Sequence, residues 1–374
     1  MATNLLLVSD GSLLGPERVL ETLHDAGLGA AHTEDPERVP GLLKGLPVPL
    51  VVDTRTVGVE SLLGRLRGTR ELAQLPVVAL VREATDASMA EALSWGADTA
   101  VPVDNLDELG PTARALCALE LDANPSVTRG AVVVAFTDPD ERRMRARPLR
   151  AVGFEVLFAA DPDELAGALA LSEVCAVLAD AALFRGTPAR DVTALQAADP
   201  SRRPWVLTTA APEVPSLLKA LLSARASVVS RNAPPEDALF LLNDQLRTAS
   251  TDGRESARLL HATVARFRAA GASRVRHGVT YNLSKEGVFV RTVLPPSRGS
   301  LVWLELRPHG DDTMVHLECQ VIWTRPFGAS QGASAPAGFG VHIEAMTPRD
   351  RDRWLAGYRR VGQSLVTQFP DAVE

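Results

Sequence analysis

Two short groups of polar residues have the types and spacing that suit an anionic, aromatic ligand. Arg254 and Arg258 are separated by three residues, and Asn282, Ser284 and Gly287 follow further along the chain. Guanidinium groups pair with phosphate oxygens through two hydrogen bonds and also stack on aromatic bases, which lysine does less well. Asn and Ser offer short polar side chains for a base edge or a phosphate, and Gly allows a tight turn beside a ligand. Together the groups predict a site for a ligand with phosphates and planar bases.

The residues around these groups predict the element that positions them. Short runs of alternating apolar and polar residues, separated by turn signals, are typical of a small antiparallel barrel. The arginine pair precedes its first strand, and the Asn-Ser-Gly group forms the turn between its second and third strands. A helix should follow, with Thr347 as N-cap and Pro348 at the first position; Trp303 and Trp323 are expected in the barrel core. The expected strands are Thr263–Arg268, Gly278–Asn282, Gly287–Thr292, Leu301–Arg307, Val315–Trp323 and Gly338–Ile343.

Upstream of the barrel, short apolar runs alternate with amphipathic stretches in two successive copies. This rhythm is typical of parallel sheets wrapped by helices, so the fold class is multidomain: two doubly wound α/β domains, then the barrel and its helix. Turn-rich polar joins suggest boundaries at 1–121, 129–247 and 252–365. The expected strands are Leu5–Val8, Leu50–Val52, Val77–Val81 and Thr99–Val103, then Ala131–Phe136, Glu155–Phe158, Ala176–Ala179, Trp205–Leu207 and Ser227–Ser230.

Composition narrows the class of protein. The 374 residues are 46% hydrophobic and carry a net charge of −7, which is ordinary for globular domains and argues against a nucleic-acid partner. Cys117, Cys175 and Cys319 are far apart, so neither a disulfide framework nor a CxxC metal site is expected. The start of the chain has no basic or long apolar segment, which predicts a cytoplasmic protein without membrane insertion.

The two polar groups resemble the signature of the PilZ domain family, in which R-x-x-x-R precedes [DN]-x-S-x-x-G. The likeness continues through the first, third and last expected strands and covers roughly residues 250–362. The resemblance implies a PilZ barrel with cyclic di-GMP as its ligand. Arg254 and Arg258 would contact phosphates and guanine faces, and Asn282, Ser284 and Gly287 would complete the site. One position departs from many ligand-binding members, because Gly253 stands where they carry a further arginine.

Each half of the signature also has a structural interpretation. In a chain this rich in arginine, an R-x-x-x-R pair can be surface charge or a contact for a partner protein. Asn-x-Ser-x-x-Gly can be an Asx-type turn between two strands. The PilZ fold is therefore expected whether or not the site binds a nucleotide.

Residues 1–119 and 130–246 resemble the receiver domains of response regulators. Phosphotransfer there requires acidic groups around Mg²⁺, an aspartate nucleophile and a lysine. In the first domain Asp10 belongs to the acidic pair and Asp53 lies at the acceptor position, which makes Asp53 the candidate phosphoacceptor. The other family positions are occupied by Ser9 in the acidic pair, Val81 at the hydroxyl switch, and Val101 or Pro102 in place of lysine.

The second receiver-like domain departs further from the family. Phe136 and Thr137 occupy the acidic-pair positions, Asp180 the acceptor position, Thr208 the switch and Arg231 the lysine position. Without the acidic pair Mg²⁺ has too few hard oxygen ligands. Both domains are therefore expected to be pseudo-receivers, and no metal is expected.

These features together predict a signalling adapter rather than an enzyme. The sequence contains no nucleophile elbow, H-E-x-x-H motif or nucleotide-binding glycine loop. Cyclic di-GMP would close the arginine segment over the barrel, while the receiver-like domains bind partner proteins. The face of the fourth and fifth receiver strands would also allow a homodimer.

Three alternatives stay open. The chain could be a nucleotide-independent interaction scaffold that regulates motility or polarity, using all three folds as binding surfaces. It could be a phosphorylatable response regulator acting through Asp53. A DNA-binding output is the weakest alternative, because no helix-turn-helix pattern follows the receiver-like domains and the net charge is negative.

Overall fold

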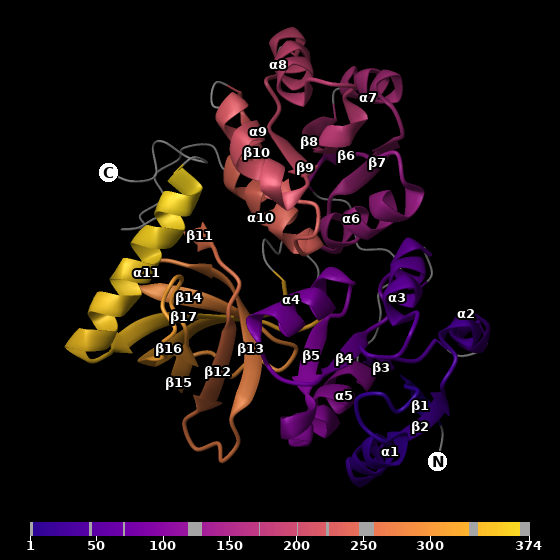
Figure 1. Ribbon diagram of the computed structural model, residues 1–374, viewed down its shortest axis with the longest axis vertical. Helices are drawn as coiled ribbons and strands as arrows, with labels where there is room; N and C mark the ends of the chain where they lie inside the picture. Colours follow the sequence, from indigo (N-terminus) through magenta and orange to yellow (C-terminus); the bar gives the residue numbers. More distant parts are fainter. Residues whose placement is uncertain are drawn as a thin grey trace. The chain divides into compact units, whose positions relative to one another are not determined.

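Three β-sheets organise the part of the chain that the structure describes (Figure 1). The computed structural model describes residues 3–44, 47–69, 72–118, 129–171, 173–199, 201–221, 224–246, 258–328 and 336–366. One compact unit comprises residues 1–122, 256–329 and 336–361, and the other comprises residues 123–255, 330–335 and 362–374. The first unit thus holds both the amino-terminal sheet and the barrel. No helix in these described ranges combines the length and apolarity that a bilayer crossing requires.

The amino-terminal sheet is parallel and has the strand order β2-β1-β3-β4-β5. This is the doubly wound order in which receiver domains are built. Its strands are rich in Val and Leu because both faces of the sheet are covered. The strands are β1 (Thr3–Val8), β2 (Gly29–Thr33), β3 (Leu50–Asp53), β4 (Val77–Val81) and β5 (Thr99–Pro102); the helices are α1 (Pro16–Asp25), α2 (Val39–Leu43), α3 (Val59–Gly68), α4 (Asp86–Ser94) and α5 (Leu109–Cys117).

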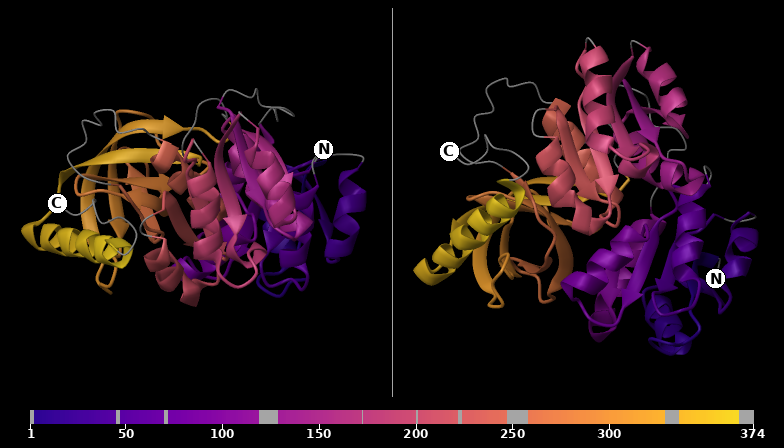
Figure 2. Two further views of the ribbon diagram at one scale, coloured as in Figure 1. Left: turned by 90° about the horizontal axis from the view of Figure 1, so that it is seen from above. Right: turned by 45° about the horizontal axis from the view of Figure 1, so that its top comes forward.

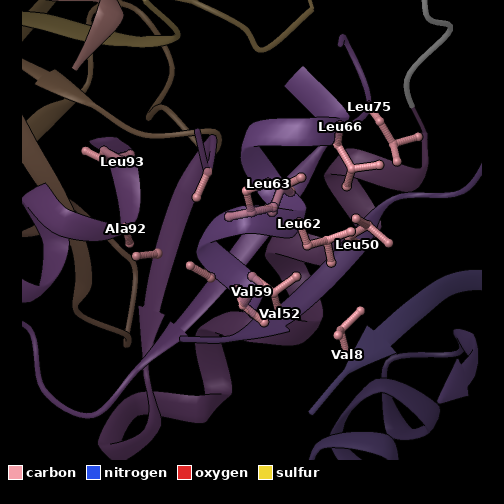
Figure 3. Packing of buried hydrophobic residues seen from close by; sticks show 14 of the residues in the cluster. Val8, Leu50, Val52, Val59, Leu62, Leu63, Leu66, Leu75, Ala92 and Leu93 are labelled. Atoms are coloured by element: carbon pink, nitrogen blue, oxygen red, sulfur yellow. The ribbon is translucent and has the colours of Figure 1, made fainter. Parts of the chain in front are cut away.

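Two hydrophobic layers cover this sheet. On one face, residues of α3 and α4 pack on alternate strand residues, and Figure 3 shows Val59 and Leu62 of α3 beside Val52 and Leu50 of β3. On the other face, α1 and α5 pack on the intervening strand residues. Helix α4 begins where the sequence dictates, because Thr85 accepts a hydrogen bond from the Ser88 backbone N–H and completes a capping box.

The second unit contains a parallel sheet of the same topology, with the order β10-β9-β8-β6-β7. Helix α6 is opened by Asp138, whose carboxylate accepts from the backbone N–H groups of the first turn, and by Pro139. The strands are β6 (Ala131–Ala135), β7 (Glu155–Ala159), β8 (Val174–Asp180), β9 (Trp205–Thr209) and β10 (Ala226–Ser230); the helices are α6 (Pro139–Ala151), α7 (Pro162–Leu169), α8 (Pro188–Ala198), α9 (Val214–Ala220) and α10 (Pro235–Leu246).

The carboxyl-terminal sheet closes on itself. Strands β13, β12, β15, β16, β17 and β14 pair in that order, and β14 pairs again with β13, so six antiparallel strands form a barrel; the short β11 adds to β13. Helix α11 lies against the outside of the barrel (Figure 2). The bounds are β11 (Leu259–Leu260), β12 (Val264–Ala269), β13 (Arg276–Leu283), β14 (Gly287–Arg291), β15 (Leu301–Leu306), β16 (Val315–Arg325), β17 (Gly338–Ala345) and α11 (Pro348–Val366).

These folds confirm the predicted fold class, including the start of α11. The Asp350 backbone N–H donates to the Thr347 hydroxyl over 3.1 Å, so Thr347 caps a helix whose first residue is Pro348. Two short edge strands, β2 and β11, were not expected from the sequence. The division into three domains at 1–121, 129–247 and 252–365 stays a prediction. By its packing the chain divides into two compact units, and one of them holds both the first α/β domain and the barrel.

Candidate ligand-binding site

The register between β11 and β13 brings the end of the arginine segment to the Asn-Ser turn. The aligned pairs are Leu259 with Leu283 and Leu260 with Asn282. One step further along this antiparallel register, Arg258 comes opposite Ser284. Of the two arginines expected at the site, Arg258 is therefore placed beside the turn, whereas Arg254 lies outside the described residues.

The turn between β13 and β14 is held by its own backbone and by one hydroxyl. The Ser284 N–H donates to the Gly287 carbonyl over 2.8 Å, which closes the hairpin. The Ser284 hydroxyl accepts from the Glu286 N–H at 3.3 Å. Ser284 thus stabilises the turn as well as facing the arginine segment, so the structural and ligand-binding interpretations of this residue are compatible.

Gly287 is required by the close approach of two strands. It pairs with His342 in the β14–β17 ladder. A Cβ atom at this position would lie 2.4 Å from the Val341 carbonyl oxygen, far inside van der Waals contact. Because that oxygen belongs to the backbone, it cannot move aside cheaply, and only glycine lets the turn lie this close to β17.

An open pocket of about 230 Å³ joins the predicted residues. This volume is below the range of sites that enclose a small ligand, so a larger ligand would lie partly outside the pocket. Asn282 is 8% exposed at its wall. The lining residues are Arg258, Asn282, Ser284, Glu286, Gly287, Val288, Phe289, Ile322, Trp323, Gly340, Val341 and His342. The structure therefore brings together four of the five predicted ligand residues.

An aromatic pair forms the apolar side of this pocket. The rings of Phe289 and Trp323 are stacked, with centroids 4.8 Å apart and planes 19° apart. Gly340 leaves room for the indole, since a Cβ there would lie 2.4 Å from the Trp323 Nε1 atom. The prediction that Trp323 belongs to the barrel core was wrong, because the ring lines the pocket and is only partly buried. Strand alternation could not show this, since a bulge in β16 shifts the register next to Trp323.

Trp303 is also misplaced by the sequence prediction. Its side chain stands on the outer face of β15 and is 42% exposed. The Arg268 guanidinium lies 4.9 Å from the centre of its ring, so the indole makes a cation–π contact on the surface instead of filling the core.

Helix α11 fixes the back of the turn. The Trp354 Nε1–H donates to the Lys285 carbonyl over 2.9 Å, and Trp354 is 1% exposed. From the adjacent strand, the Ile343 N–H donates to the Glu286 carbonyl over 2.8 Å. These bonds hold the hairpin from two elements, so the pocket wall is positioned before any ligand arrives.

The described lining of the pocket carries one positive and one negative side chain. Arg258 is the one permanently charged cation among the described lining residues, and Glu286 is an opposing carboxylate. Burial raises the pKa of the nearby Tyr358 phenol, and the Glu286 charge acts in the same direction. A ligand with two phosphates would therefore need a second cation, and Arg254 is close in sequence to Arg258.

The acceptor position of the first α/β domain is occupied by a buried, hydrogen-bonded carboxylate. Asp53 is 1% exposed at the end of β3. One oxygen accepts from the Ser9 hydroxyl and the Leu13 N–H, both at 3.1 Å, and the other accepts from the Arg55 N–H at 2.8 Å. Hydrogen bonds from Ser12 hold the pKa of Asp10 below its ordinary value. The geometry gives Asp53 a structural role in joining the loops above the sheet.

The corresponding position of the second α/β domain is closed by an ion pair. The Arg231 guanidinium lies 2.8 Å from the Asp180 carboxylate, and the Ala182 N–H donates to the same oxygen at 3.1 Å. Arg231 therefore neutralises Asp180 directly. Among the described residues, no cluster of three or more His, Cys, Asp or Glu side chains could hold a metal ion.

Comparisons with known proteins agree with the barrel. The model of the PilZ domain family matches residues 252–358. A comparison with curated proteins finds no match.

A comparison with solved structures finds several matches. The PilZ domain of YcgR from Escherichia coli, solved with c-di-GMP, is 13% identical over 32% of this chain and 98% of that chain, with a TM-score of 0.24. A putative two-component response regulator/GGDEF domain protein is 18% identical over 65% of this chain and 97% of that chain, with a TM-score of 0.29. The Bacillus subtilis inhibitor of motility is 15% identical with a TM-score of 0.24, and the matched region spans 29% of this chain and half of that protein's length.

At these identities and TM-scores the solved structures add no argument to the family match. The match itself covers the signature residues, the closed barrel and most of α11. The predicted resemblance is therefore confirmed, and residues 252–358 of this chain are a PilZ domain.

Proposed function

We propose that this protein is a cyclic di-GMP-responsive signalling adapter. The observation that carries the proposal is the convergence of Arg258, Asn282, Ser284 and Gly287 on one open pocket of the PilZ barrel. The two α/β domains would offer surfaces to partner proteins, since their acceptor carboxylates are engaged by their own domains.

The pocket supplies the chemistry that one half of the dinucleotide requires. Arg258 would pair with a phosphate or stack on a guanine. The Asn282 amide can donate to and accept from a base edge. Ile322 and Trp323 would cover the apolar face of the ring, as 43% of Ile322 is exposed beside the pocket. Arg254 would balance the second phosphate.

Titration calorimetry of the full chain with cyclic di-GMP tests the proposal. We expect the wild type to bind and Arg258→Ala to lose about 1.5–3 kcal/mol, which is roughly a tenfold to hundredfold loss of affinity for a charged hydrogen bond. Arg298→Ala is the matched control, because Arg298 is exposed between β14 and β15 and does not line the pocket. Absence of heat with the wild type would remove the nucleotide from the proposal.

A nucleotide-independent interaction scaffold, regulating motility or polarity, is the second candidate. It is favoured by Gly253 at the position of a further arginine and by the acceptor carboxylates of the two α/β domains, which are engaged by their own domains. The same titration separates the two functions.

A homodimer through the fourth and fifth strands would have to use the second α/β domain, since α4 and β5 of the first pack on the barrel.

A phosphorylatable response regulator acting through Asp53 has less support than the adapter or the scaffold. Attack on a phosphoryl group would require Asp53 to give up hydrogen bonds from Ser9 and Leu13. Beryllofluoride with Mg²⁺ should leave the intrinsic tryptophan fluorescence of the full chain unchanged. A saturable change that disappears in Asp53→Asn would restore this function.

A further inference from the structure

The barrel completes the hydrophobic core of the first α/β domain. Val279 of β13 is 5% exposed and belongs to the apolar cluster that α3 and α4 form on one face of the sheet. Val293, which follows β14, is 6% exposed and belongs to the cluster on the opposite face, with α1 and α5. Barrel residues therefore enter both layers of the domain's core, so the contact is built like a protein interior.

A carboxylate of α4 holds the connection between β11 and β12. Asp86, the first residue of α4, accepts from the Thr263 hydroxyl at 3.1 Å and from the Val264 N–H at 2.5 Å. Thr263 is 2% exposed and bonds in turn to Thr280 of β13, because its N–H donates to the Thr280 hydroxyl over 2.9 Å. This connection leads directly from the short strand β11, which begins at the residue after Arg258.

A second polar contact lies at the start of β13, at the end of the strand away from the pocket. The Glu108 carboxylate, just before α5, accepts from the His277 N–H at 3.1 Å and lies 2.7 Å from the His277 Nδ1 atom. The two side chains are 9% and 11% exposed. The Asn105 amide donates to the same carboxylate and to the Val275 carbonyl. The first α/β domain thus holds the start of β13 through Glu108. Through Asp86 of α4 it also holds the β11–β12 connection, which lies beside Thr280 of β13.

One strand therefore carries both the domain contact and the ligand pocket. His277 and Val279 make the contact with the first α/β domain, Thr280 binds the connection that Asp86 holds, and Asn282 lines the pocket. The pairing with β14 changes register between Thr280 and Asn282. Such a bulge re-aims the side chains that follow it, so the direction of Asn282 depends on how the preceding half of β13 is held.

We propose that the first α/β domain controls the ligand affinity of the PilZ pocket through the Asp86–Thr263 contact. The contact holds the β11–β12 connection and β13 together, and these two segments place Arg258 and Asn282 on the same pocket. Docking of α4 favours the arrangement that binds the ligand, and the bound ligand favours docking to the same extent. This inference rests on the proposed cyclic di-GMP function and adds its regulation.

Calorimetry of full-length variants measures the coupling. Asp86→Ala should weaken cyclic di-GMP binding by about fivefold or more, in line with typical coupling between sites. Glu91→Ala is the matched control, because Glu91 is an exposed carboxylate of the same helix with no hydrogen bond to the barrel among the described contacts. Thr263→Val removes the same hydroxyl contact from the barrel side, and the double variant should lose little more than either single variant.

Hydrogen exchange gives a reading that does not depend on the measured affinity. Saturating cyclic di-GMP should slow amide exchange in α4 and β5 of the wild type, and this slowing should be lost in Asp86→Ala. A wild type that binds no cyclic di-GMP would overturn both the proposed function and this inference. Equal affinity of wild type and Asp86→Ala, with unchanged exchange in α4, would overturn the inference alone and leave the proposed function standing.

Discussion

Replacing His261 by glutamine should make the barrel less sensitive to acid. His261 follows β11, and its ring lies edge-on to the ring of His309, with centroids 5.1 Å apart. Its Nε2 atom is buried without a hydrogen-bond partner in the described structure. Burial lowers the pKa of His261 to about 4; the nearby His309 adds to this effect, and Asp86 opposes it.

The magnitude follows from the difference between the folded and unfolded pKa. The unfolded ring has a pKa near 6.5 and the folded ring near 4, so the unfolded state takes up a proton first as the pH falls. The stabilising contribution is complete above the unfolded pKa and is lost between the two values. Because one pKa unit corresponds to about 1.4 kcal/mol, the loss at about pH 5 is about 2 kcal/mol.

Native-state hydrogen exchange of β12 and β13 amides, corrected for the intrinsic rate, measures the opening free energy at each pH. Between about pH 7 and pH 5, the wild type should lose about 2 kcal/mol more than His261→Gln. His316→Gln is the control, because the His316 side chain is 65% exposed on β16. The reasoning is refuted if His261→Gln and the wild type lose the same free energy over this interval.

Three further substitutions test contacts described above. Gly287→Ala should destabilise the barrel by about 1–3 kcal/mol, since its Cβ would lie 2.4 Å from the Val341 carbonyl; thermal unfolding measures this. Arg67→Met should cost about 3–5 kcal/mol, because the buried guanidinium bonds to Asp98 at 3.0 Å, and urea unfolding of the full chain measures the loss. Trp354→Phe removes one hydrogen bond from α11 to the hairpin, and exchange of the turn amides should show a loss of about 1 kcal/mol.

Controls distinguish these effects from general sensitivity to mutation. Gly64→Ala lies in α3 with no atom within 4 Å of the new Cβ, so it should stabilise the helix by about 0.5–1 kcal/mol. Trp354→Phe keeps the apolar ring in place, so a fully unfolded barrel would contradict a hydrogen-bonding role. An Arg67→Met protein as stable as the wild type would contradict the account of its buried ion pair.

The sequence predicted the sheets well where alternation and burial act locally. The Val-rich runs of β4 and β6 have the length and the β-branched residues that favour buried strands, and the polar turn after β13 indicated a hairpin. Strand β2 was missed because Gly29–Thr33 contains no apolar run and lies at the edge of its sheet, where only Thr33 is buried. Strand β11 was missed because two residues are too short for any periodic signal.

The candidate site was predicted in its polar residues and missed in its apolar ones. Arg258 and Asn282 are recognisable because their residue types fit the family signature at a fixed spacing. Trp323 carries no such signal, since its orientation depends on a bulge in β16. The docking of Val279 and Val293 could not be predicted either, because an apolar strand residue has the same pattern whether it faces the barrel interior or another domain.

Because the first α/β domain and the barrel share a hydrophobic core, the sequence family and the compact structural unit have different boundaries. The PilZ family match covers residues 252–358, whereas the compact unit that contains the barrel also includes the first α/β domain. Excising it would expose Val279 and Val293 to water and leave their neighbours in the first α/β domain uncovered. A fragment cut at the family boundary should therefore be prone to aggregation, whereas a fragment that keeps the first α/β domain with the barrel would leave both valines covered.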